Sequence, residues 1–291
     1  MMRRQSQQGF TLVEMIMVIV ITGIIGGMVA VFLKAPIQQY MDVARRADMT
    51  DIADTALRRI GRDLRLALPN SVRVTGTCTG GVTSCFIEFL PTKGGGRYRA
   101  DVAPPGASAG CGSLAADALN FTIADTCFEV LGPMPSAVAG DSVVVYNMTS
   151  NPGDPNPNAY VGGNRTAYGS TVGAVMNIAS KLFPLDSPAH RFHIISTPVT
   201  YACDGAGMLW RYWGYVIQSA QTSTDSIAKL NALIAVQGSR ALLAANVSSC
   251  GFSYDLFVVA QRSGLVTMNL GITENNETVT LYSATHVSNV P

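Results

Sequence analysis

The sequence has few charged residues and very few histidines. Only 13% of the 291 residues are Asp, Glu, Lys or Arg, the formal net charge is +1, and three residues are His. A protein that binds nucleic acid through phosphate contacts needs a basic surface, so we do not expect a nucleic-acid partner. Hydrophobic residues make up 48% of the chain. This excludes a disordered chain, because disorder requires low hydrophobicity and high net charge.

Motifs typical of enzymes are also missing. The chain has no phosphate-binding loop, no dinucleotide fingerprint and no Cys-x-x-Cys pair. His190 and His193 are three residues apart, which on a strand would place them on opposite faces. The segment GFSYD at 251–255 matches only the first half of a hydrolase GxSxG motif. We therefore expect no catalytic residues, no cofactor and no metal, and a protein that is not an enzyme.

A calcium loop is the alternative weighed for residues 151–164, which are rich in Pro, Asn and Gly. Asp154, Asn156 and Asn158 have the 1-3-5 spacing of calcium ligands. The sixth position is Ala159 rather than Gly, and the twelfth is not Glu. These departures favour an exposed loop without calcium.

Charge is almost absent from the first 33 residues, where Arg3, Arg4 and Glu14 are the only charged side chains. Residues 10–32 form an apolar run that Glu14 alone interrupts. As a helix, at 1.5 Å per residue, this run spans the ~30 Å hydrocarbon core of a bilayer. Arg3 and Arg4 precede the run and are expected to keep the N-terminus in the cytoplasm, so that the remainder lies outside.

Glu14 is the fifth residue of the apolar run. An acidic side chain at the centre of a membrane helix costs ~2.5–3.5 kcal/mol on insertion scales, and such residues are usually functional. The alternative is that Glu14 lies close enough to the helix end to reach water at little cost.

The residues GFTLVE at 9–14 stand after a short basic leader and before an apolar helix. They resemble the signature of type IV prepilins and of the pseudopilins of type II secretion. The resemblance implies that a prepilin peptidase cleaves between Gly9 and Phe10 and methylates the new amine. It implies that Phe10, Thr11 and Glu14 serve assembly, with Glu14 of an entering subunit neutralising the amine of a neighbour already in the filament. An amine and a carboxylate attract strongly where the dielectric is low.

The branch of this family is a separate question. The length of the chain and the segments 198–211 and 286–291 resemble the large minor pilins of MSHA (mannose-sensitive haemagglutinin) pili. This resemblance implies a subunit that helps to initiate a filament, with other major and minor pilins and an inner-membrane assembly platform as partners. The alternatives are a J-type minor pseudopilin of a type II secretion system and, in another class, a membrane-anchored adhesin or enzyme.

Four segments follow from these patterns: a leader at 1–9, a membrane and filament-core helix at 10–33, an amphipathic helix at 34–68, and a periplasmic head at 69–291. Apolar residues recur at three- and four-residue steps from Met49 to Leu68, which predicts the amphipathic helix. The head is rich in short apolar segments separated by turn residues, so we expect an α+β fold with a long helix packed on a mostly antiparallel β head. A helix is predicted at 225–236, and the head is expected to be one domain with one or two sheets. Strands are predicted at 71–75, 85–90, 119–123, 127–131, 142–147, 192–196, 209–217, 252–260, 265–270 and 279–284.

Two predictions concern local features of the head. Gly94-Gly95-Gly96 and Glu274-Asn275-Asn276 are predicted as turns. The segment 209–215 contains both Trp residues and is predicted as a central strand buried on both sides, with Trp213 and Tyr215 on one face.

All six cysteines lie in the predicted periplasmic head, which is an oxidising environment, so an even count indicates disulfides. Fifteen complete pairings exist. The pairing we expect joins neighbours in sequence: Cys78–Cys85, Cys111–Cys127 and Cys203–Cys250.

Overall fold

The computed structural model describes residues 9–78, 83–101, 117–259 and 263–291. The leader arginines Arg3 and Arg4, and Cys111, lie outside the described residues. The chain divides into two compact units, residues 1–48 and 49–291, and the boundary falls within the long helix α1 (Leu12–Leu64). Pro36 lies inside α1 without ending it.

The part of α1 in the first unit is apolar and exposed. Every described side chain from Leu12 to Leu33 is exposed to solvent, including Ile19 at 64% and Val31 at 76%. This stretch is long and apolar enough to cross a membrane. Because no protein surface covers it within its own unit, its apolar side chains require a lipid or protein environment.

The part of α1 in the second unit has one buried face. Met49, Ala53, Ala56, Leu57 and Ile60 are at most 4% exposed and belong to the main hydrophobic core. Each large apolar side chain that is fully buried contributes about 1.5–3 kcal/mol to folding. The amphipathic spacing read from the sequence is therefore the spacing that packs this stretch against the head.

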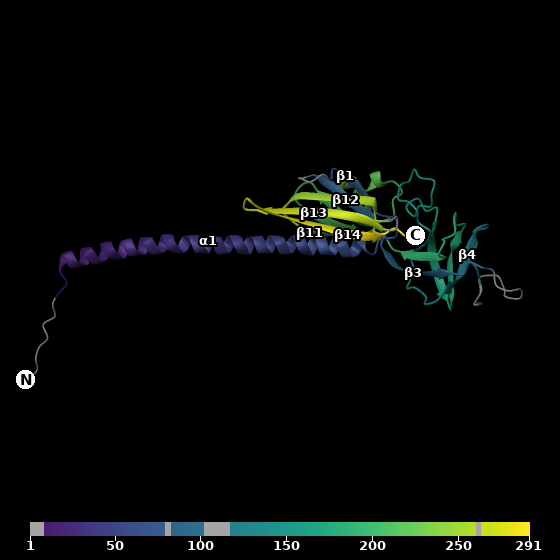
Figure 1. Ribbon diagram of the computed structural model, residues 1–291, viewed down its shortest axis with the longest axis horizontal. Helices are drawn as coiled ribbons and strands as arrows, with labels where there is room; N and C mark the ends of the chain where they lie inside the picture. Colours follow the sequence, from purple (N-terminus) through teal and green to yellow (C-terminus); the bar gives the residue numbers. More distant parts are fainter. Residues whose placement is uncertain (1–8, 79–82, 102–116, 260–262) are drawn as a thin grey trace, which may run out of the picture. The chain divides into compact units, whose positions relative to one another are not determined.

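Two antiparallel sheets of the second unit provide the other side of that core (Figure 1). The three-stranded sheet ends in a hairpin whose turn residues, Asn275 and Asn276, have φ of 49° and 65°, as a two-residue turn requires. The predicted turn at this position is confirmed. The five-stranded sheet has the order β1 (Arg73–Gly76), β2 (Ser84–Phe89), β9 (Val199–Asp204), β10 (Leu209–Trp213), β11 (Ser239–Ala244), and the three-stranded sheet the order β12 (Val247–Val259), β13 (Ser263–Glu274), β14 (Glu277–Ser288).

The remaining strands form a closed barrel with its own core. Tyr98, Phe128, Met176 and Phe192 are fully buried there. A short helix, α2 (Ile227–Val236), packs through its buried residue Leu230 in a separate cluster. The barrel has the order β3 (Thr92–Tyr98), β4 (Asp125–Leu131), β7 (Val175–Lys181), β6 (Arg165–Val172), β5 (Ser142–Val145), β8 (Arg191–Ile195).

The predicted α+β class, with a long helix and a mostly antiparallel β head, is confirmed. Several local predictions are wrong. No strand forms at 119–123, because the Asn120 carboxamide oxygen accepts the N–H of Thr122 at 2.7 Å and of Ile123 at 3.1 Å, which bends the chain. Strands β3, β6, β7, β9 and β11 were not predicted, and the described residues of the head form three sheet systems instead of one or two.

The predicted turn at Gly94-Gly95-Gly96 is also wrong, because these residues lie inside β3. Gly95 pairs with His193 of β8, and a Cβ at Gly95 would lie 2.6 Å from the carbonyl oxygen of Phe192. The glycine therefore permits the close approach of two barrel strands and does not reverse the chain.

The first five residues of the aromatic segment form β10, which is an interior strand of its sheet between β9 and β11. The prediction that Trp213 and Tyr215 lie on one face of the strand is wrong. Trp213 packs on the core that includes α1, whereas Tyr215 belongs to the cluster with Tyr212 and Leu230. The strand ends at Trp213, and Gly214 has φ of +84°, so the alternation does not continue to Tyr215.

Candidate processing and assembly site

The predicted cleavage point lies in front of the first turn of α1. Gly9 and Phe10 are exposed and outside the helix, and Phe10 is 84% exposed. A Cβ at Gly9 would meet no atom within 4 Å. The fold itself therefore does not require glycine here, and an exposed, irregular peptide bond of this kind is accessible to a protease.

Thr11 and Glu14 form a capping box at the start of α1. The Thr11 hydroxyl oxygen accepts the backbone N–H of Glu14 at 3.3 Å. In return, Glu14 Oε2 accepts the backbone N–H of Thr11 at 3.4 Å and the Thr11 hydroxyl at the same distance. This is the reciprocal pattern of Ser/Thr-x-x-Glu helix starts, and it satisfies two N–H groups that the helix leaves without partners.

The capping box gives the Glu14 carboxylate a local role that sequence reasoning missed. The spacing Thr11-x-x-Glu14 was visible in the sequence and predicts this arrangement. A negative charge in the first turn also interacts favourably with the positive end of the helix dipole. Glu14 therefore stabilises the start of the helix through one carboxylate oxygen, Oε2, which makes both of its contacts with Thr11.

The cysteines give two of the three predicted pairs. Cys78–Cys85 and Cys203–Cys250 are disulfides in the structure. Both disulfides belong to the hydrophobic core against which α1 packs, since Cys85, Cys203 and Cys250 are buried in that core. The third predicted pair, Cys111–Cys127, involves a residue outside the described part of the chain.

The other candidate residues remain separate. His193 lies on β8 and has its pKa lowered to about 4, chiefly by burial and secondarily by the charge of Arg191. His190 precedes β8 with φ of +52° and faces Asp186, with its Nδ1 at 3.5 Å from the carboxylate. Within the described residues, no three His, Cys, Asp or Glu side chains are grouped in a way that could hold a metal ion.

The candidate calcium residues are used within their own loop. Asp154 Oδ1 accepts the backbone N–H of Asn156 at 3.0 Å, and its side-chain amide at 2.8 Å. Asn158 is buried, and its carboxamide oxygen accepts the backbone N–H of Tyr160 at 2.9 Å. These contacts shape the loop.

Comparison with known proteins gives one finding, and it concerns the N-terminus. No curated protein and no solved structure matches the chain. The family model that describes the prokaryotic N-terminal methylation motif matches residues 4–30, which include the cleavage point, the capping box and the first part of α1. The chain thus carries a type IV pilin-like signal, which indicates a pilin- or pseudopilin-like substrate of prepilin peptidase with a membrane-anchoring helix.

Proposed function

We propose that this protein is a minor type IV pilin of the MSHA type that takes part in starting pilus assembly. The observation that carries the pilin part of the proposal is the methylation motif at residues 4–30, followed by a long exposed apolar helix and a disulfide-containing β head. The MSHA part rests on the resemblance of the segments 198–211 and 286–291 to large minor pilins. In this proposal the protein first resides in the inner membrane with a cytoplasmic N-terminus and a periplasmic head. After cleavage it enters the filament through contacts of α1 with other pilins.

Cleavage between Gly9 and Phe10 would create an amine at Phe10 that is largely cationic at neutral pH. In a low-dielectric filament core an isolated amine or carboxylate is costly, and a pair of the two is much less so. Glu14 of this chain would then neutralise the amine of a neighbouring subunit. The capping box supports this role because it fixes the carboxylate next to the first turn, where such an amine would arrive.

We propose a structural role and no enzymatic one. The support is the separation of the titratable candidates: His190 faces the carboxylate of Asp186, whereas His193 lies on β8 with its pKa lowered chiefly by burial. A J-type pseudopilin would share the same motif and the same helix. Neighbouring genes separate the two readings, because a secretin and exported hydrolases indicate secretion, whereas a major pilin and adhesion genes indicate a pilus.

The first test is the intact mass and N-terminal residue of the full chain after co-expression with a prepilin peptidase. We expect loss of residues 1–9, with N-methylated Phe10 as the first residue. An inactive peptidase serves as the control and should leave the chain at full length. A full-length product with the active enzyme, or a cut beyond residue 25, would contradict the pilin route and return the anchored adhesin or enzyme to consideration.

A further inference from the structure

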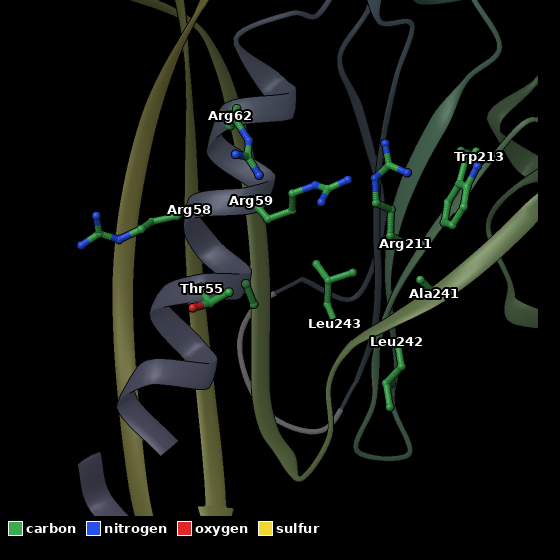
Figure 2. A pocket seen from close by; sticks show the side chains of 10 residues that line it. Thr55, Arg58, Arg59, Arg62, Arg211, Trp213, Ala241, Leu242 and Leu243 are labelled. Atoms are coloured by element: carbon green, nitrogen blue, oxygen red, sulfur yellow. The ribbon is translucent and has the colours of Figure 1, made fainter. Parts of the chain in front are cut away.

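A groove runs between α1 and the last two strands of the five-stranded sheet (Figure 2). Its volume is about 690 Å³. Arg59 and Arg62 of α1, Trp213 of β10 and Leu242 and Leu243 of β11 are among its lining residues. All of them belong to the second compact unit.

Strand β11 borders this groove and is the last strand of its sheet. It pairs with β10 on one side, and within the described residues no strand pairs with its other side. An edge of this kind presents unpaired N–H and C=O groups, and proteins usually protect such edges with charges, Pro or bulges that face the open side. The only charged side chain of β11 is Arg240, and its guanidinium stacks 4.5 Å from the centre of the Trp210 ring.

The guanidinium of Arg240 is therefore directed over the neighbouring strand β10 and not toward the open side of β11. It also donates from Nη1 to the Asn231 carboxamide oxygen at 2.8 Å, which ties it to α2. Leu242, in contrast, is 47% exposed on the same strand. Residues 241–243 thus form an accessible apolar stretch of the open edge.

The charges of the groove are unbalanced. Arg59 and Arg211 share one carboxylate, that of Asp63, at 3.5 Å and 3.0 Å. The hydroxyl of Tyr201 also donates to Asp63, at 2.7 Å. Arg62 is exposed and has no ion pair among the described residues. The helix wall beside the open strand is therefore cationic and would attract carboxylates and repel basic side chains.

We propose that β11 is a docking edge for an extended acidic segment of another protein chain. The segment would add as a sixth strand, with backbone hydrogen bonds to β11 supplying affinity and its Asp or Glu side chains meeting Arg59 and Arg62. Apolar side chains on the alternate positions would lie on the opposite face of the added strand, beside Leu242, which pairs with Trp210. A second copy of this chain is a poorer occupant, because pairing two β11 edges would bring two cationic grooves together.

The probe is a labelled ten-residue peptide of alternating Glu and Val, titrated against the full chain in an uncharged-headgroup detergent and followed by fluorescence anisotropy. We expect saturable binding below 1 mM. A matched peptide with N-methyl groups on four consecutive central residues cannot pair its backbone, and we expect it to bind at least tenfold more weakly. A Lys-Val peptide should not bind.

Two matched charge reversals locate the site. Arg62→Glu should weaken binding of the Glu-Val peptide at least fivefold. Arg97→Glu makes the same change at an exposed residue of β3 in the barrel and should alter binding less than twofold. The proposal is overturned if nothing binds at 1 mM, if the N-methylated peptide binds equally, or if both reversals weaken binding alike. Dimerisation of the chain through β11 without peptide would assign the edge to a second copy and also overturn it. No assembly machinery is used, so failure here leaves the proposed function untouched.

Discussion

The two parts of α1 differ in what covers their apolar side chains. From Leu12 to Leu33 the helix is apolar on all sides except at Glu14, and its side chains are exposed. From Met49 to Leu64 it is amphipathic, and the apolar side chains of its core-facing side are at most 4% exposed. Both stretches have the same backbone conformation. The difference shows that the distribution of apolar residues, and not the helix itself, determines the environment that each stretch needs.

Four predictions use this difference, beginning with the largest expected effect. Ile60→Asp places an unpaired carboxylate where the side chain is fully buried. Burying such a group costs several kcal/mol, so we expect the head to lose more than about 4 kcal/mol of stability and to unfold. The measurement is thermal unfolding by circular dichroism together with protease resistance of the head.

Ile52→Asp is the matched control for Ile60→Asp. Ile52 lies two turns earlier on the same helix and is 44% exposed. The same substitution there should change the stability of the head by less than about 1 kcal/mol, because the carboxylate stays in water. Equal losses from the two variants would show that the buried face is not what stabilises the head.

The second prediction compares glycines. A Cβ at Gly61 would lie 2.8 Å from the Thr285 hydroxyl oxygen of β14, whereas a Cβ at Gly26 would meet nothing within 4 Å. We expect Gly61→Ala to destabilise the head by about 1–3 kcal/mol, since overpacking outweighs the gain in helix propensity. Gly26→Ala should not destabilise the helix, because Ala favours it by up to about 1 kcal/mol.

Chemical denaturation of each variant measures the difference between these glycines. Thr285→Ala should restore most of the stability that Gly61→Ala removes, because it deletes the hydroxyl that the new methyl group would meet. Loss of stability that persists in the double variant would place the strain elsewhere.

The third prediction concerns the capping box, at the start of the exposed stretch. Glu14→Gln keeps a side chain that can cap the helix but removes the charge, whereas Glu14→Ala removes both. We expect both variants to be cleaved normally by prepilin peptidase, because the scissile bond lies outside the helix. Incorporation into filaments should fall in both, and further for Glu14→Ala.

Thr11→Ala and Thr11→Ser complete the third test, with the fraction of chain in sheared filaments as the measurement. Loss of the N-cap costs about 1 kcal/mol of helix stability, and Ser should restore it. If Glu14→Ala and Glu14→Gln are both incorporated at the normal level, the proposed role of the Glu14 charge is wrong.

Much of this architecture was predictable, because it depends on local patterns. The apolar run, the amphipathic spacing and the GFTLVE motif each lie within about 25 consecutive residues, and each indicates its structure without reference to the rest of the chain. The hairpin turn at Asn275 and Asn276 is equally local. The disulfides Cys78–Cys85 and Cys203–Cys250 join cysteines that are neighbours in sequence order.

The missed features depend on contacts between distant residues. Gly95 looks like a turn residue until β8 is placed beside it, since the need for glycine arises from the Phe192 carbonyl. Likewise, no local pattern in residues 239–244 marks β11 as an edge strand, and its open edge follows only from the strand order of the sheet. Such features could not be read from local patterns because strand pairing selects its partners across the whole head.

The smallest effect is expected on the solvent-facing side of α1 between Met49 and Leu64. Arg58 Nε pairs with the Asp54 carboxylate at 2.6 Å, one helical turn away, but the Arg58 side chain is 79% exposed. Exposed pairs of this kind contribute only about 0.3–0.5 kcal/mol, because water screens the charges and ordering two long side chains costs entropy. Arg58→Ala should therefore lower the free energy of unfolding of the head by no more than about 0.5 kcal/mol, as measured by chemical denaturation, and 1 M salt should abolish the difference. A loss above 1 kcal/mol that persists in salt would mean that the side chain of Arg58 packs on the head, and that the exposed face of this stretch also contributes to its stability.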